Sequence, residues 1–354
     1  MPLTSRFMAA ALMFAIVPLA APAIAQGAYQ PPRTAEGKPD LQGVWSSATA
    51  TPMERPKGYP LVISRAQADE LEGNTLFNQR MKTQANYVDP NEGAPEKGKP
   101  LPPVGNYDVA YTDPGAHVTS IGGELRSSWV VWPEDGKIPT LTEAGRNLRD
   151  SSARVIGNGY DNPEERGLGE RCVLMSGGPP LRSGLYNNNV QIVQTPEHVM
   201  LMVEMVHDVR VARMKGTPRQ DGVETWMGDP VARWDGDTLV IETRNLHNDQ
   251  RRDRTVLSDT GRIIERFTRI SDRQMLYQFE IDDPITYASV WRGETALNRL
   301  DQPIYEYACH EGNYALPGIL AGARAEEAEA AAKAAEAAKA AEAAKASAKP
   351  AKGG

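Results

Sequence analysis

The residues best suited to acid–base chemistry lie where an apolar stretch is interrupted. Glu204 interrupts the apolar run Val199–Met205, and His207 and Asp208 follow where the alternation changes phase. An imidazole beside a carboxylate can be oriented by it and can exchange protons near neutral pH. We therefore predict His207 and Asp208 as catalytic residues and Glu204 as a ligand contact. A solvent-facing position is the alternative for Glu204, and Asp208 shares a side with His207 only if a bulge intervenes.

A second candidate group lies in the segment Tyr305–Tyr314 (YEYACHEGNY). We predict Tyr305 and His310 as acid–base residues at a cavity mouth, with Tyr307 and Glu311 as ligand contacts. The alternative is a tyrosine-rich strand end that is packed by a disulfide.

Motifs for other chemistries are absent from the sequence. There is no G-x-G-x-x-G after a strand, no P-loop, no G-x-S-x-G and no H-E-x-x-H, and the five histidines are not paired at metal-ligand spacing. Asp235-Gly236-Asp237 fits a hairpin turn better than a calcium site. We therefore predict neither a metal nor a cofactor.

The N-terminus is typical of an export signal. Residues 7–21 are apolar and Ala23-Ile24-Ala25 matches a cleavage site, so we predict a signal peptide over residues 1–25 and a periplasmic or secreted protein. A transmembrane anchor is the alternative. In an oxidising compartment the only two cysteines, Cys172 and Cys309, are expected to form a disulfide, with two buried free thiols as the alternative.

Composition excludes some classes of partner. The chain has 354 residues, 24% of them charged and 40% hydrophobic, which allows a sizeable core. Its formal net charge of -7 leaves no basic excess to neutralise phosphates, so nucleic-acid binding is disfavoured. A small-molecule ligand or substrate is the expected partner.

Strand-like segments dominate residues 186–322. They follow one another at hairpin spacing without a helix between them, which predicts a mainly β fold: an antiparallel up-and-down barrel or a strongly curved sheet. The Asp235-Gly236 pair is the clearest hairpin signal. The predicted strands are 190–193, 199–205, 207–214 after a bulge, 231–234, 238–243, 263–270, 275–281, 287–297 and 304–309.

Residues 26–185 form a Pro-rich wrapping segment that contains most of the 27 prolines. Capping boxes predict one helix that begins after Ser64 and runs towards Met81, and another that begins after Thr140. Ser128–Trp132 is a strand candidate between them. Residues 323–354 are a low-complexity Ala/Glu/Lys tail, predicted to be a helical spacer. A cell-envelope contact through Lys345, Lys349 and Lys352 is the alternative for this tail.

Several segments resemble a family of secreted bacterial proteins without an established function. They are Thr34–Trp45 (TAEGKPDLQGVW), Asp135–Thr142 (DGKIPTLT), Glu170–Cys172 (ERC), Tyr186–Asn189 (YNNN), Trp234–Leu239 (WDGDTL) and Tyr305–Tyr314. The resemblance spans roughly residues 31–322 and implies no particular activity. A looser similarity, through Gly43-Val44-Trp45, is to lipocalin-like barrels.

Three functions remain open from the sequence. The first is a periplasmic protein that binds a small apolar ligand inside a barrel, with the Met-rich segment Met200–Val203 as an adaptable lining. The second is a lyase, isomerase or hydrolase that uses His207, Asp208, Tyr305 and His310. The third is a structural envelope protein. A pocket with converging polar groups would favour the enzyme, an apolar pocket the carrier and no pocket the structural protein.

Overall fold

A computed structural model describes residues 29–75, 77–79, 112–155, 159–175, 178–253 and 255–347. The chain divides into two compact units, Met1–Gln30 and Pro31–Gly354, and the second unit is described below. The predicted signal peptide, Met81, Lys349 and Lys352 lie outside the described residues. Among the helices that are described, none is both long and apolar enough to span a membrane.

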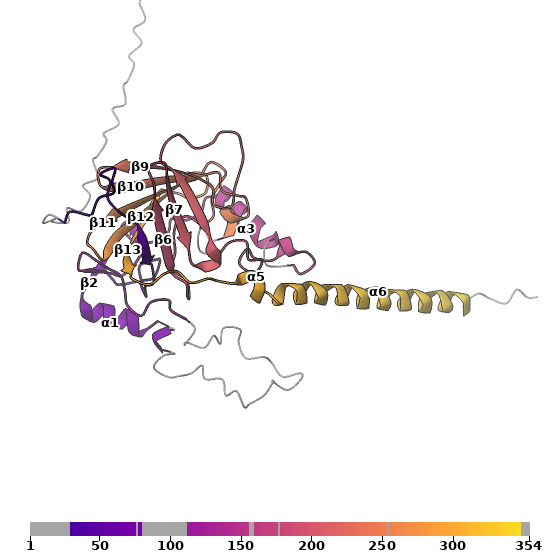
Figure 1. The fold of residues 1–354 in the computed structure, drawn as a ribbon. Helices are drawn as coiled ribbons and strands as arrows, with labels where there is room; N and C mark the ends of the chain where they lie inside the picture. The colour runs from indigo at the N-terminus through magenta and orange to yellow at the C-terminus, as the bar shows by residue number, and fades with distance from the viewer. Residues whose placement is uncertain are drawn as a thin grey trace, which may run out of the picture. The chain divides into compact units, whose positions relative to one another are not determined.

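Nine strands close into a barrel at the centre of this unit (Figure 1). The ring closes because the last strand pairs with the first, Val44 lying opposite Leu300. The barrel prediction is therefore confirmed. In order around the ring the strands are β1 (Gly43–Ser46), β6 (Asn189–Gln194), β7 (His198–Val203), β8 (Val209–Arg213), β9 (Asp229–Asp235), β10 (Thr238–Arg244), β11 (Arg262–Arg269), β12 (Gln274–Asp282) and β13 (Trp291–Leu300).

The barrel is mixed and not purely antiparallel. β8 and β9 run parallel and meet through a single residue pair, Arg213 opposite Val231, whereas the other neighbours in the ring are antiparallel. A parallel pair needs a crossing connection, and residues 214–228 supply it. The up-and-down prediction is wrong at this pair.

The two ends of the predicted strand series also differ from expectation. β1 comes from the Pro-rich segment, more than a hundred residues before β6, so hairpin spacing could not identify it. The predicted strand 304–309 is wrong: β13 ends at Leu300, and Cys309–Gly312 is a short helix, α5. Because β1 already pairs with β13, closure leaves no edge there for a further strand.

The predicted bulge near Val206 is a hairpin turn. β7 and β8 are the two arms, with Met202 opposite Val209, and a 3-10 turn, η3 (Met205–His207), joins them. Val206 and His207 have φ of 60° and 52°, the left-handed values that such a reversal needs. The shift in the alternation of apolar residues near Val206 therefore marks the point where the chain reverses direction.

Helices and a small sheet surround the barrel. α1 (Arg65–Gly73) has both hydrogen bonds of the capping box that Ser64 predicts. α3 (Glu143–Val155) begins later than expected, because the Thr142 hydroxyl, and not that of Thr140, accepts from Gly145 N at 3.0 Å. The remaining elements are β2 (Val62–Ile63), β3 (Ser120–Ile121), β4 (Glu124–Arg126), β5 (Val130–Trp132), η2 (Pro163–Glu165), α4 (Gln250–Asp253) and α6 (Ala315–Ser347).

Two of these elements bear on the sequence predictions. β5 confirms the strand candidate 128–132 and pairs with β13. The tail is helical as expected, but α6 begins at Ala315 and so includes Leu316, Ile319 and Leu320, which precede the low-complexity region.

Side chains fill the interior of the barrel. Along β12 alternate residues point inward, and Met275, Tyr277, Phe279 and Ile281 are at most 1% exposed. A Cβ at Gly293 would lie 2.3 Å from Phe279 Cζ, so only glycine leaves room there for the phenyl ring. This barrel is a packed core, as small barrels usually are.

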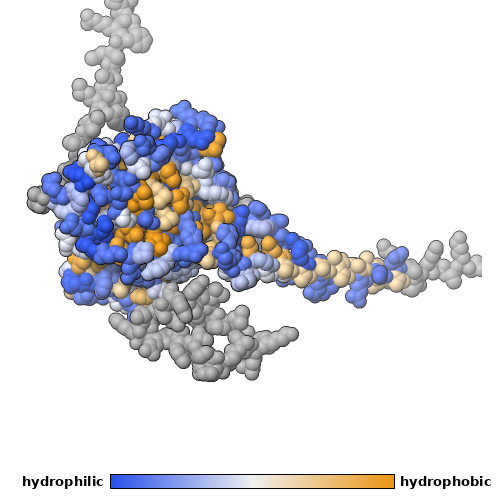
Figure 2. Space-filling view, viewed as in Figure 1, coloured by the Kyte–Doolittle hydropathy of each residue, from blue (hydrophilic) through white to orange (hydrophobic). Residues whose placement is uncertain are grey.

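The Met-rich segment lies on the wall of the barrel and not in a cavity. Strand alternation turns Leu201 and Val203 inward, whereas Met200 and Met202 are half-buried on the outer face. Figure 2 shows apolar surface in the middle of the face where β6 and β7 are drawn in Figure 1. The predicted methionine lining is therefore wrong for these two residues.

The connections define two ends of the barrel. The disulfide end carries residues 178–188, the 204–208 turn, residues 245–253 and 255–261, and the Cys172–Cys309 bond. The Trp234 end carries residues 33–39, the β6–β7 turn, the end of β8 and the β9–β10 turn.

Candidate functional site

Glu204, a predicted ligand contact, is buried at the disulfide end. It is 4% exposed; its Oε2 accepts from Asn189 Nδ2 at 2.7 Å and its Oε1 accepts from Tyr305 N at 3.3 Å. The carboxylate therefore joins the β7–β8 turn to the start of β6 and to the segment that follows β13. Both carboxylate oxygens are therefore used in hydrogen bonds that hold these segments together.

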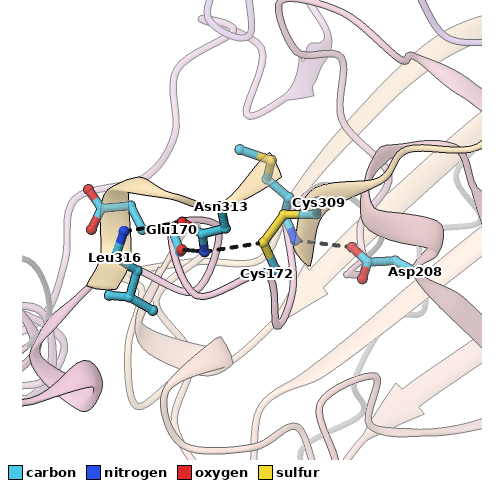
Figure 3. Close-up of a disulfide and its surroundings, with 7 residues drawn as sticks. Glu170, Cys172, Asp208, Cys309, Asn313 and Leu316 are labelled. Atoms are coloured by element: carbon cyan, nitrogen blue, oxygen red, sulfur yellow. Dashed lines mark hydrogen bonds between the residues drawn. A yellow bond between two sulfur atoms is a disulfide. The ribbon is translucent and has the colours of Figure 1, made fainter. Parts of the chain in front are cut away.

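His207 and Asp208 direct their side chains to different partners. His207 is exposed, and its Nε2 accepts from Tyr307 N at 2.9 Å. Asp208 is buried, and its Oδ2 accepts from Met175 N at 3.0 Å (Figure 3). These contacts hold two chain segments against the turn. The inward position expected for His207 is therefore wrong, because the residue lies in the turn that ends β7 and not within a strand.

The structure brings the two predicted groups together through the backbone of residues 305–307. Tyr307 is half-buried and stacks on Tyr186 at 6.4 Å between ring centroids. Tyr305 is 63% exposed, and His310 and Glu311 are also exposed. The two groups therefore lie near each other, but their side chains do not enclose a space between them.

The disulfide is present and fixes this end. Cys172 and Cys309 are bonded with their Cα atoms 5.8 Å apart. Asn313 Nδ2 donates to Glu170 O at 2.7 Å and lies 3.5 Å from Cys172 Sγ, so the start of α6 is held against the same loop (Figure 3).

The disulfide end carries one very small pocket and one open hollow. The pocket lined by Met175, Pro179 and Gln250 has a volume of about 10 Å³, the space of a single water. A shallower hollow of about 280 Å³ is lined by Thr49, Thr51 and Trp129. The Thr49 hydroxyl lies 3.1 Å from both Thr51 Oγ1 and His117 O, one of which takes its proton, and it accepts from Thr51 N at 3.1 Å, so it is already used within the protein.

A buried ion pair occupies the middle of the barrel. Arg210 and Glu265 are both at most 1% exposed and form two hydrogen bonds, one of them of 3.0 Å between Nη2 and Oε1. The Tyr277 hydroxyl donates to Glu265 at 2.8 Å and accepts from Leu181 N at 2.8 Å. Burial, together with the Glu265 carboxylate, raises the pKa of Tyr277 well above its ordinary value. Arg210 Nε is buried and has no hydrogen-bond partner within the described residues, whereas the other polar atoms of these three side chains bond to one another inside a packed core.

The largest of the three pockets described lies at the Trp234 end. Its volume is about 440 Å³, within the range usual for small-molecule sites. Four segments that are distant in sequence form it: residues 34–38, residues 194–196, Met214 with Lys215, and Arg233 with Trp234. We call it the Trp234 pocket.

One wall of the Trp234 pocket is a tight turn formed by residues 34–38, at the start of the Thr34–Trp45 motif. Thr34 N donates to Lys38 O at 2.8 Å and Gly37 N donates to Thr34 O at 2.9 Å. Gly37 has φ of 74°, a value that glycine adopts without strain. Arg33 anchors the turn through two hydrogen bonds to Asp237, of 2.6 and 2.8 Å.

The opposite wall comes from the hairpin that the Asp235-Gly236 pair predicts. Asp235 lies opposite Thr238, and Gly236 has φ of 56°, as the turn requires. Trp234 is half-buried, lies opposite the fully buried Leu239 and packs against the core. The indole is therefore a firmly held apolar wall.

Charged side chains stand around this apolar wall. Lys38, Lys215 and Arg233 line the pocket, with one carboxylate, Glu36. The hydrogen bond from Arg33 holds the pKa of Asp237, beside the pocket, below its ordinary value. In the described part of the chain, no group of three or more His, Cys, Asp or Glu side chains could hold a metal ion.

None of the predicted site residues lines the Trp234 pocket. The sequence did contain a signal for it: the Thr34–Trp45 and Trp234–Leu239 motifs meet here through Asp237 and Arg33, the residue just before the first motif. Their contact joins residues about two hundred positions apart, which periodicity within one segment cannot show.

The chain matches no protein-family model, and comparison with curated proteins and with solved structures also gives no match. The resemblances to a secreted bacterial family and to lipocalins stay expectations from the sequence. The function is therefore argued from the pocket.

Proposed function

We propose that this protein is a binding protein that takes a small organic molecule in the Trp234 pocket. The observation that carries the proposal is a pocket of about 440 Å³ with a half-buried tryptophan in its wall. Met214 and Pro196 extend that apolar wall. Apolar walls with a few polar groups around them are typical of sites for small molecules.

The small apolar ligand that the sequence predicts is still part of this proposal, but its site is the Trp234 pocket and not the barrel interior. Tyr277, Phe279 and Trp291 fill the barrel interior, so a ligand there would have to displace the core. At the Trp234 end a ligand can enter without any rearrangement of the strands.

The geometry supports binding over acid–base catalysis. His207, Asp208 and Glu204 each hold a chain segment by a hydrogen bond, and the adjoining pocket has room for one water. A substrate needs to lie within hydrogen-bond reach of a general base, and the pocket lined by Met175 offers little space for it. We therefore propose no reaction.

Isothermal titration calorimetry with 2-naphthoate, a small molecule with a flat apolar body, tests the proposal. We expect binding to the wild-type protein and a loss of about tenfold or more in Trp234→Leu, because an aromatic wall contributes beyond its buried area. Trp132→Leu is the matched control, since Trp132 is 40% exposed on β5 and does not line the pocket. Equal affinity in both variants would contradict the proposal.

A further inference from the structure

The Trp234 pocket concentrates positive charge in an acidic protein. Three cationic side chains, Lys38, Lys215 and Arg233, line it against the single carboxylate of Glu36, whereas the whole chain has a net charge of -7. Three further acids lie at this end: Asp237, which is paired with Arg33, and the exposed Asp235 and Glu197, which follow the lining residues Trp234 and Pro196. The lining of the pocket itself therefore carries an excess of cations, with the carboxylates outside it.

The three cations come from three separate segments. Lys38 belongs to the 33–39 turn, Lys215 follows β8 and Arg233 lies on β9. Within the described residues none of the three has an ion-pair partner, although arginine–carboxylate pairs are common elsewhere in the same barrel, as at Arg262–Asp282. Like charges brought together repel, so such a cluster favours an anion in its centre.

The apolar wall and the cations face the same space. Lys38, Lys215 and Arg233 line the same pocket as Trp234 and Met214. Ammonium and guanidinium groups bind carboxylates and sulfonates through charge-assisted hydrogen bonds. One ligand can therefore use both features at once.

We propose that the ligand of the Trp234 pocket is a small organic acid: a flat apolar body that carries one anionic group. The body lies against Trp234 and Met214, and Lys38, Lys215 and Arg233 hold the acid group. This inference rests on the proposed function and specifies its ligand class. The cations are exposed, so salt screens the attraction and binding weakens as ionic strength rises.

Calorimetry with a matched pair of probes separates this inference from the proposed function. 2-Naphthoate and 2-naphthamide have the same ring system and nearly the same size, and only the first is charged. We expect the acid to bind about tenfold more tightly at low salt, since hydrogen bonds to charged groups are stronger than neutral ones. Equal affinities would overturn the inference and leave the proposed function standing, whereas no binding of either probe would overturn both.

Charge variants locate the effect. Lys38→Gln combined with Lys215→Gln and Arg233→Gln should lower the affinity for 2-naphthoate to that for 2-naphthamide and leave the amide unchanged. Lys57→Gln is the control, because Lys57 is an exposed lysine away from the pocket. Arg233→Lys keeps the charge and should retain the preference for the acid. A preference for the acid that survives the triple change, in a variant whose thermal melt matches the wild type, would overturn the assignment.

Discussion

The two ends of the barrel use their polar side chains differently. At the disulfide end Glu204, His207 and Asp208 are all bonded to backbone or side-chain groups of neighbouring segments, and the pocket lined by Met175 has space for one water. At the Trp234 end Lys215 and Arg233 line a pocket of about 440 Å³ without an ion pair among the described residues.

The comparison shows that a residue type suited to acid–base chemistry is not by that fact available to a ligand. An imidazole or a carboxylate that completes a turn contributes to folding, because leaving its partner unsatisfied would cost free energy. A cation that faces open space contributes little to folding and is available to a ligand. Mutations at the disulfide end are therefore expected to lower the free energy of unfolding, and mutations at the Trp234 end to lower ligand affinity.

Removal of the disulfide should have the largest effect of the changes considered. The double substitution Cys172→Ala and Cys309→Ala opens a loop of 137 residues, and we expect the free energy of unfolding to fall by about 2–5 kcal/mol. Denaturant unfolding measures the loss. Below the melting temperature the affinity of the Trp234 pocket should stay the same; a parallel loss of affinity would show that the two ends are coupled.

Glu204→Gln should have the next largest effect. The substitution keeps the shape but puts an amide where two donors, Asn189 Nδ2 and Tyr305 N, meet a buried carboxylate. We expect a loss of about 1–3 kcal/mol in the free energy of unfolding, the usual cost of an unsatisfied buried group. Glu306→Gln is the control, because Glu306 is exposed in the same segment. Equal stability of the two variants would show that the carboxylate is not a structural group.

Asp237→Asn should alter the Trp234 pocket more than the stability. Arg33 is bonded to both carboxylate oxygens, so the amide loosens the 33–39 turn that carries Lys38. We expect a few-fold loss of affinity for 2-naphthoate and little change in the thermal melt, since the pair is exposed. Glu164→Gln, an exposed carboxylate away from the pocket, is the control.

The pH dependence of this anchor has a definite sign. The hydrogen bond from Arg33 lowers the pKa of Asp237 from its ordinary 3.8, so the anchor is complete above that ordinary value. It is lost only as the pH falls through the still lower pKa of the folded state. The contribution of the 33–39 turn to ligand affinity should therefore stay constant from neutral pH down to about pH 5. A loss of affinity within that range would have to come from another group.

Local signals in the sequence predicted local structure well. The Asp235-Gly236 hairpin and the Ser64 capping box depend on neighbouring residues, and both are present. β1 closes the ring across more than a hundred residues, and the parallel pair β8–β9 follows a long connection, so neither has a hairpin signal. The disulfide was predictable because only one pairing of two cysteines exists.

The candidate site could not be predicted in the same way. His207 and Asp208 were chosen because reactive types interrupt an apolar run, but a tight hairpin turn produces the same interruption. Residue type alone does not reveal which partners a side chain has. The Trp234 pocket depends on the contact of Arg33 with Asp237, which only the closed barrel brings together.

Truncation after Arg324 should have the smallest effect. The part of α6 beyond this residue is exposed through Ala344, and the contacts that hold the helix lie before it or at it: Ala323 is 8% exposed and Arg324 donates to Asp161 O at 2.9 Å. We expect the free energy of unfolding to change by less than about 0.5 kcal/mol, as for surface changes in general. Truncation after Tyr314 is the comparison, because it also removes the half-buried Leu316, Ile319 and Leu320 and should destabilise the disulfide end measurably. Thermal melts of the two shortened chains decide the point, and equal melting temperatures would show that the first turns of α6 contribute nothing to this end. Neither truncation should alter 2-naphthoate binding, since no residue of α6 lines the Trp234 pocket.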